Sequence, residues 1–371
     1  MNPLFTGTQV GPYPVSHRVV MAPLTRMRTD ADNVPGALMV DYYAQRASSG
    51  GLLISDATSV SPLGFAYVGA PGIYTEAHTH GWRRVTHAVH AKGGRIFLQL
   101  WHAGRQAHPA NIVGEVPVAP SAIRAYEHSA IHDENGLVVE VEQVVPRALA
   151  LEEIPGFIEE FRYAAALAKR AGFDGVELHA ANGYLPDQFL QDGSNHRTDA
   201  YGGSLENRAR FLFEVLDAIA SVWDADQIAV RLSPGSSYGT MSDSDPHATF
   251  GYVARRLDGY GLAYLHVVEP RVRGNDDIDA AASAVSAKDL RQMFKGTLIA
   301  AGGFTADSAR RIIEAGDADL VAFGRLFISN PDLPERLRVG APLNCYDRST
   351  FYGGDARGYT DYSFHSAAPV I

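Results

Sequence analysis

The sequence predicts an α/β protein folded as a TIM barrel, a (β/α)₈ barrel, in a single domain spanning residues 1–371. Two observations favour this fold: short apolar runs with the composition of buried strands recur along the chain, and segments with helical periodicity separate them. A third disfavours the alternative, a doubly wound sheet, because no GxGxxG fingerprint follows an early strand.

The predicted barrel strands are short, apolar and poor in charge, which is typical of parallel strands covered on both faces. They are RVVMAP from Arg18, GLLISDAT from Gly51, RIFLQL from Arg95, GVELH from Gly175, IAVRL from Ile228, AYLHVV from Ala263, TLIAA from Thr297 and DLVAF from Asp319. Each parallel crossover needs a connection, and helical segments such as GFIEEFRYAAALAKRAG and TADSARRIIEAG supply it and stop at glycine.

Two stretches depart from this repeat. Between Ala103 and about Pro155 no amphipathic helix is evident, whereas LVVEVEQV alternates like a strand, so we expect an excursion with a hairpin after the third strand. From Tyr346 onward the tail carries aromatic residues among glycines, which predicts an ordered segment packed over an opening. These aromatic residues are Phe351, Tyr352, Tyr359, Tyr362 and Phe364.

Composition excludes several classes of protein. The formal net charge of −10 disfavours a surface that collects nucleic-acid phosphates. Because the first residues lack a signal-peptide pattern and no apolar run reaches the length of a bilayer, we expect a cytoplasmic protein without a membrane partner, either a monomer or a homodimer. Cys345 is the only cysteine, which excludes an internal disulfide and a CxxC zinc site, and we interpret it as inert.

In a TIM barrel the reactive groups lie at the carboxyl ends of the strands. The residues that leave the predicted strands are unusually polar or glycine-rich. They are Pro23, Leu24, Thr25, Ala57, Thr58, Gln99, Trp101, His179, Asn182, Tyr184, Arg231, Gly302, Gly303, Gly324 and Arg325.

The glycine pairs after the last two strands indicate a phosphate site, because backbone N–H groups approach an anion closely at glycine and Arg325 adds a charged donor. The alternative is that the glycines only make turns while Arg325 pairs with a surface acid. Gln99 and Arg231 interrupt apolar strands and must meet polar partners, either a structural network or a planar hydrogen-bonding cofactor.

His179 and Asn182 are three residues apart, so a helical turn starting at the strand end would direct both donors at one oxygen. Tyr184 would point elsewhere and deliver a proton. Two alternatives stay open: His179 is a satisfied core histidine, or it binds a metal with Glu177 and His266, although no compact ligand set such as HExxH accompanies them, and we expect no metal site.

At these residues the sequence resembles the old yellow enzyme family, the flavin-dependent ene-reductases of the NADH:flavin oxidoreductase / NADH oxidase group. The resemblance covers nearly the whole chain. At Thr25 the chain resembles the branch of the family that carries threonine at that position. The motifs are MAPLTRMR from Met21, YYAQRAS from Tyr42, GAPGIY from Gly69, QLWHAGR from Gln99, VELHAANGYLPDQFL from Val176, SNHRTDAYGGSLENRARF from Ser194, AGGF from Ala301, VAFGRLFISNPDLPERL from Val321 and DRSTFY from Asp347.

The resemblance implies non-covalent FMN, reduced by NADPH or NADH, and reduction of an electron-poor alkene. His179 and Asn182 would bind the carbonyl or nitro oxygen, and Tyr184 would protonate the α-carbon. Flavin-ring contacts would come from Pro23, Leu24, Thr25, Ala57, Gln99 and Arg231, phosphate contacts from Gly302, Gly303, Gly324 and Arg325, and pocket walls from Tyr67, Trp101 and Tyr352.

Two other functions fit the same residues. A phosphate-binding barrel lyase or isomerase would need a Schiff-base lysine or a carboxylate pair at strand ends, and neither is prominent. A non-catalytic flavin carrier would bind the flavin without passing its electrons to an enone.

Overall fold

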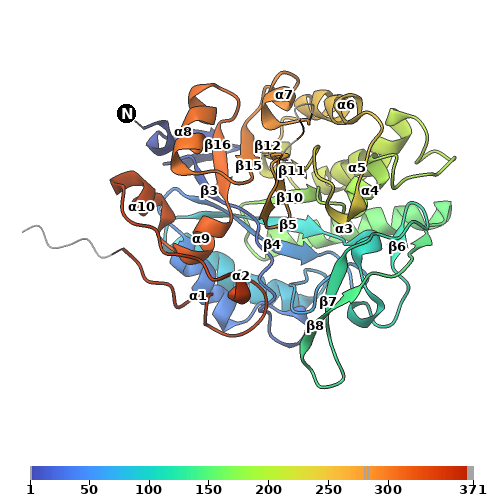
Figure 1. Cartoon of the computed structure of the whole chain (residues 1–371), viewed down its shortest axis with the longest axis horizontal. Helices are drawn as coiled ribbons and strands as arrows, with labels where there is room; N and C mark the ends of the chain where they lie inside the picture. The colour runs from blue at the N-terminus through green and yellow to red at the C-terminus, as the bar shows by residue number, and fades with distance from the viewer. Residues whose placement is uncertain (1, 280, 282–283, 366–371) are drawn as a thin grey trace, which may run out of the picture.

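A computed structural model describes residues 2–279, 281 and 284–365 and contains the predicted closed barrel of eight parallel strands (Figure 1). All eight predicted runs form barrel strands. In barrel order they are β10 (Gly175–Ala180), β11 (Ile228–Leu232), β12 (Tyr264–Val268), β15 (Leu298–Ala301), β16 (Leu320–Phe323), β3 (Val19–Met21), β4 (Leu52–Ser59) and β5 (Arg95–Trp101).

Alternation along these strands separates two cores. Val19 and Met21 face outward and join the apolar cluster shared with the helices, whereas Val20 faces inward and joins a smaller cluster inside the barrel. The inner cluster also contains Phe97 of β5 and Tyr264 of β12. Toward the carboxyl ends of β5, β10, β11 and β12 the inward-facing residues become polar, and the site begins there.

The helices cover the barrel from outside (Figure 1). Side-chain caps start several of them: Thr75 accepts from the His78 N–H at the start of α2, and Ser204 accepts from the Asn207 N–H at the start of α5. The helices are α1 (Ala37–Arg46), α2 (Glu76–Ala91), α3 (Ile154–Arg170), α4 (Leu185–Leu190), α5 (Leu205–Ala220), α6 (Pro246–Asp258), α7 (Ala287–Arg291), α8 (Ala306–Glu314), α9 (Arg325–Ser329) and α10 (Leu333–Val339). Within the described ranges, none of these helices is long and apolar enough to cross a bilayer.

Four short strand pairs complete the chain. The hairpin of β1 (Thr8–Val10) and β2 (Tyr13–Val15) packs Val10 and Val15 into the inner core. The excursion after β5 contains the predicted hairpin, β7 (His128–His132) with β8 (Val138–Glu142), and the pair β6 (Val118–Ala119) with β9 (Arg147–Ala148). The loop after β12 forms β13 (Val272–Arg273) and β14 (Asp276–Asp277).

The tail is ordered as predicted through residue 365, and buried arginines hold it. The Arg26 Nε donates to the Phe351 carbonyl at 2.7 Å, and the Arg46 Nη2 donates to the Tyr359 carbonyl at 3.0 Å. The Tyr359 ring is stacked on Tyr42 with centroids 4.0 Å apart. Because these guanidinium groups bind carbonyl oxygens of the tail, the tail is part of the folded barrel and not a loose end.

Candidate functional site

The site begins with inward-facing polar residues at the carboxyl ends of neighbouring strands. His179 on β10 is in register with Arg231 on β11, and Arg231 is in register with His266 on β12. One step deeper, Gln99 on β5 is in register with Glu177 on β10. The strand pairing therefore places five polar side chains in two adjacent layers of the barrel interior.

Glu177 is the centre of a buried network. Its Oε1 accepts from the Gln99 Nε2 at 2.7 Å, and its Oε2 accepts from the His266 Nδ1 at 2.9 Å. Burial pushes the pKa of Glu177 upward, but His266, Arg231 and Gln99 outweigh burial and hold it below its ordinary value. The Gln99 amide nitrogen therefore belongs to a structural network, which is one of the two interpretations of this residue. The metal alternative required Glu177 and His266, and these two side chains bind each other.

Arg231 and His179 keep unpartnered nitrogen atoms in this layer. The Arg231 Nε and the His179 Nδ1 are buried and have no hydrogen-bond partner among the described residues. Burial, reinforced by the charges of Arg231 and His266, holds the pKa of His179 well below its ordinary value, so its imidazole is neutral at pH 7. Buried donors without protein partners point to a polar ligand at this end of the barrel.

The turn after β10 corrects one expectation. No helical turn follows the strand directly: Asn182 has a left-handed backbone with φ of 56°, and α4 starts only at Leu185. The Asn182 N–H donates to the Ser233 hydroxyl at 2.7 Å, and its carbonyl accepts from the Gln106 Nε2 at 2.8 Å. Contacts from two other loops therefore fix Asn182, and the argument from helical spacing does not apply.

Tyr184 lies at the same end of the barrel within an aromatic cluster. Its ring meets the His179 ring edge-on with centroids 4.8 Å apart and the Trp101 ring at 5.3 Å. Its hydroxyl is 3.4 Å from that of Tyr67, which is 2.9 Å from the hydroxyl of Tyr238. Burial is the main cause that raises the pKa of Tyr184, so the phenol stays protonated at neutral pH.

Asp56 anchors the segment that follows β3 and carries Pro23, Leu24 and Thr25. The Arg26 N–H donates to the Asp56 Oδ2 at 2.8 Å. Asp56 lies within the register shift of β4, between Ile54 and Ala57. A β-carbon placed on Gly324 would lie 3.3 Å from the Leu24 side chain. The predicted ring contacts and the predicted phosphate loop are therefore neighbours.

The predicted phosphate loop has the expected backbone. Gly302 and Gly303 have φ of 113° and 60°, conformations that favour glycine, and Gly324 is the residue before α9. Arg325, however, is paired with Asp277 of β14, with its Nη1 2.9 Å from the Asp277 Oδ2. Arg325 therefore pairs with an acid, as the alternative to a phosphate site expected. The acid, Asp277, belongs to the loop after β12.

These features fit FMN. Unpartnered donors of Arg231 and His179 suit the polar edge of a flavin or a ligand above it, and glycine backbones beside Arg325 suit a phosphate. Tyr352, predicted as a pocket wall, is half exposed, and its hydroxyl accepts from the Asn275 side chain.

Sequence reasoning missed several residues of this region. Tyr238 and Asp277 lie in loops without a motif, and Tyr238 meets Tyr67 across 171 positions of the chain. Asp187, whose Oδ2 accepts from the Gly183 N–H at 2.8 Å, lies inside a recognised motif but carried no signal of its own.

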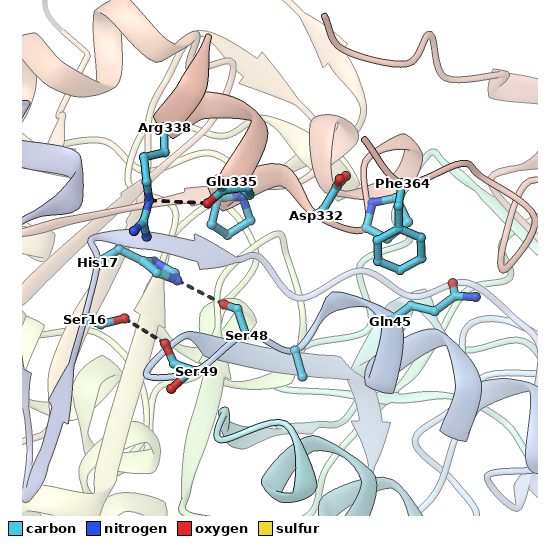
Figure 2. A pocket seen from close by; sticks show the side chains of 12 residues that line it. Ser16, His17, Gln45, Ser48, Ser49, Asp332, Glu335, Arg338 and Phe364 are labelled. Carbon is cyan, nitrogen blue, oxygen red and sulfur yellow. Dashed lines mark hydrogen bonds and ion pairs between the residues drawn. The ribbon is translucent and has the colours of Figure 1, made fainter. Parts of the chain in front are cut away.

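A separate pocket of about 370 Å³ lies at the opposite end of the barrel (Figure 2). His17 and Ser48 line it just before β3 and β4 begin, with Glu335 and Arg338 of α10 and with Phe364 of the tail. The His17 Nε2 lies 3.1 Å from the Ser48 hydroxyl. Because active sites of this fold use the carboxyl ends of the strands, this pocket is not part of the candidate site.

Comparisons with known proteins agree with this geometry. The model of the NADH:flavin oxidoreductase / NADH oxidase family matches residues 3–344. 12-Oxophytodienoate reductase 2 of Arabidopsis thaliana is 45% identical over 370 residues, which covers 97% of this chain and 95% of the relative. Flavin oxidoreductase hxnT of Emericella nidulans is 42% identical and covers 98% of each chain.

Solved structures give the same result. Morphinone reductase is 51% identical, superimposes with a TM-score of 0.93, and covers 98% of this chain and 97% of its own. Another structure of morphinone reductase, 50% identical, contains tetrahydroNAD. The old yellow enzyme homologue from Zymomonas mobilis is 41% identical with a TM-score of 0.91, covering 97% and 99% of the two chains. The chain therefore belongs to the NADH:flavin oxidoreductase / NADH oxidase family, the FMN-dependent and NAD(P)H-linked ene-reductases of the old yellow enzyme type.

Proposed function

We propose that this protein reduces the carbon–carbon double bond of an α,β-unsaturated carbonyl or nitro compound, with His179, Asn182 and Tyr184 as the residues that act on the substrate. The observation that carries the proposal is the edge-on contact of Tyr184 with His179, whose buried Nδ1 has no protein partner in the described chain. A proton donor and an oxygen-binding donor thus share one end of the barrel.

His179 and Asn182 would bind the substrate oxygen and stabilise the negative charge that develops there. Because burial keeps His179 neutral, it binds this oxygen through one N–H and without a full positive charge. Asn182 adds an amide donor, held by Ser233 and Gln106 through its backbone. Two preorganised neutral donors suit an oxygen on which negative charge develops during the reaction.

Tyr184 would protonate the α-carbon. Its raised pKa keeps the proton on the phenol until a strongly basic carbon develops beside it, and its contacts with Trp101 and Tyr67 hold the ring in place. FMN, when bound, supplies the hydride that reaches the β-carbon, after accepting it from NADPH or NADH.

The remaining assigned residues would hold the flavin. Arg231, balanced by Glu177, would stabilise negative charge on the ring, and Thr25 would tune it by a hydrogen bond. Pro23, Leu24, Ala57 and Gln99 would contact the ring, and Gly302, Gly303, Gly324 and Arg325 would hold the phosphate, while Tyr67, Trp101 and Tyr352 would line the substrate pocket. We further propose a cytoplasmic monomer or homodimer. The net charge of −10 supports the proposal that it has no nucleic-acid partner.

Purified protein, reduced anaerobically with NADPH and then mixed with cyclohexenone, tests this proposal. We expect a yellow protein whose absorbance bleaches with NADPH and returns with the enone. Tyr184→Phe should reduce its flavin at nearly the normal rate but slow reoxidation by the enone. Equal loss of both steps would exclude Tyr184 as the proton donor, and a flavin that no enone reoxidises would indicate a flavin carrier.

A further inference from the structure

The anion site at the barrel mouth already contains a carboxylate of this chain. Asp277 binds Arg325 through both of its oxygens, and one of the two contacts, between Oδ2 and Nη1, measures 2.9 Å. A β-carbon placed on Gly303 would lie 3.1 Å from the Asp277 Oδ1, so the carboxylate lies directly against this glycine. A bidentate carboxylate beside a glycine backbone has the arrangement that a phosphate would adopt there.

Two further arginines surround Asp277. The Arg271 Nε donates to the Gly302 carbonyl at 2.8 Å, while its Nη2 is buried and has no hydrogen-bond partner among the described residues. Arg348 binds Asp276 at 3.0 Å. Hydrogen bonds from Arg325 are the main cause that lowers the pKa of Asp277, and the charges of Arg348 and Arg271 add to it.

The local charges come from three guanidinium groups, on Arg271, Arg325 and Arg348, and from three carboxylates. Asp276 and Asp277 bind Arg348 and Arg325 directly. The third carboxylate, Glu269, acts on Arg271 through its charge, and burial raises the pKa of Glu269. A phosphate monoester carries between about 1.5 and 2 negative charges at pH 7, more than one carboxylate supplies. The site is therefore suited to exchange Asp277 for a phosphate.

We propose that Asp277 is an internal competitor of the FMN phosphate, occupying the anion site on Arg325 and Gly303 and leaving it when the phosphate binds. The free Nη2 of Arg271 then becomes a second phosphate donor, a role that the motif at Gly324 and Arg325 does not assign. This inference rests on the proposed phosphate contacts of Gly303 and Arg325. It does not depend on which alkene is reduced.

Flavin affinity tests the proposal without measuring turnover. The full-length chain is freed of flavin and titrated with FMN and with riboflavin, which lacks the phosphate, while flavin fluorescence is followed. Asp277→Asn should lower the Kd for FMN by about five- to tenfold, because the apparent affinity rises as the fraction of open sites rises. Its Kd for riboflavin should stay within about twofold of the wild type, because riboflavin does not use the anion site.

Asp276→Asn is the matched control, because it removes the same charge from the neighbouring residue. Asp276 binds Arg348, whereas Asp277 binds Arg325. Its Kd for FMN should stay unchanged. An unchanged Kd for FMN in Asp277→Asn, an equal gain in Asp276→Asn, or an equal gain for riboflavin would each overturn the proposal. Failure of the wild type to bind either flavin would instead refute the proposed function, and the inference with it.

Asp277→Ser is a second variant that removes the same carboxylate, and it is used if Asp277→Asn does not fold. If the flavin-free chain does not refold, the same comparison is made on the protein as purified, by the fraction of FMN that stays bound at equilibrium after dilution. Removing the competing carboxylate should raise this bound fraction relative to the wild type and Asp276→Asn. Equal bound fractions in all proteins would contradict the proposal.

Discussion

Glu177 is the residue on which the charge balance of the barrel interior depends. It is fully buried, and it is the carboxylate that compensates Arg231 while binding Gln99 and His266. Glu177→Gln should therefore lower the free energy of unfolding by roughly 3–5 kcal/mol, since it leaves a buried guanidinium without its counter-charge. Chemical denaturation followed by circular dichroism measures the change.

Glu314→Gln is the control for this prediction. Glu314 pairs with Arg310 on α8, and both side chains are well exposed, so the loss should be below about 1 kcal/mol. A loss of similar size in both variants would mean that Glu177 does not compensate a buried charge.

His179 is the residue that should bind an anionic ligand oxygen. A phenol presents an oxygen that becomes charged when the phenol ionises, so His179→Ala should weaken phenol binding by about 10- to 100-fold, the value of one hydrogen bond to a charged group. The change in flavin absorbance on phenol titration gives the Kd. Tyr184→Phe should retain near-normal phenol affinity, and an unchanged Kd in His179→Ala would refute the oxygen-binding role.

At the scale of elements, the turn between β10 and α4 determines where Asn182 and Tyr184 lie. Asp187 in α4 holds this turn, because its Oδ2 accepts from the Gly183 N–H at 2.8 Å and its Oδ1 accepts from Gln191 at 2.8 Å. Asp187→Asn presents an N–H₂ group to one of these donors and so leaves a buried donor unpaired. The unfolding free energy should fall by about 1–3 kcal/mol.

The turn's role in positioning is tested separately from its stability. Asp187→Asn should raise the KM for cyclohexenone and the Kd for phenol, while the Kd for FMN stays near the wild-type value because no proposed flavin contact lies in this turn. Asp192→Asn, a partly exposed acid that binds Ser244 instead, should leave all three constants unchanged. Parallel loss of FMN binding would show a general structural effect instead of positioning.

The sequence allowed the strands to be predicted but not this turn. Each barrel strand is a local apolar run, so Gln99 and Arg231 were conspicuous as polar interruptions and His179 as a polar residue at a strand end. Asn182 adopts a positive φ because Ser233 and Gln106, both distant in sequence, bind its backbone, and no local pattern reports such contacts. The pairing of Arg325 with Asp277 depends equally on a loop that carries no motif.

At the scale of the whole molecule, the barrel interior changes from an apolar core to a polar layer at the carboxyl ends of the strands. The β1–β2 hairpin packs into the apolar inner core, and the tail brings Tyr352 to the loop after β12. One acid outside the site should contribute to how global stability varies with pH. Glu160 on α3 is half-buried, and its Oε2 is buried without a hydrogen-bond partner among the described residues.

Burial raises the pKa of Glu160 to about 7, against the opposing effect of a hydrogen bond with Ser61. In the unfolded chain the same carboxyl titrates near 4.3, so between about pH 4.3 and 7 the folded state binds more protons than the unfolded state. The free energy of unfolding therefore falls as pH rises through this window. Glu160→Gln removes this loss and should stabilise the protein at pH 8 by about 1–3 kcal/mol, with little effect at pH 4.

Urea denaturation of both proteins between pH 4 and 8 measures this difference. Glu159→Gln is the control, because Glu159 lies one position earlier on the same helix and is exposed beside Arg162, so it should change the unfolding free energy by less than about 0.5 kcal/mol at any pH. If Glu160→Gln followed the wild type across the whole range, the carboxyl would not be titrating near neutrality. A gain that persisted unchanged at pH 4 would instead indicate better packing of the amide, independent of charge.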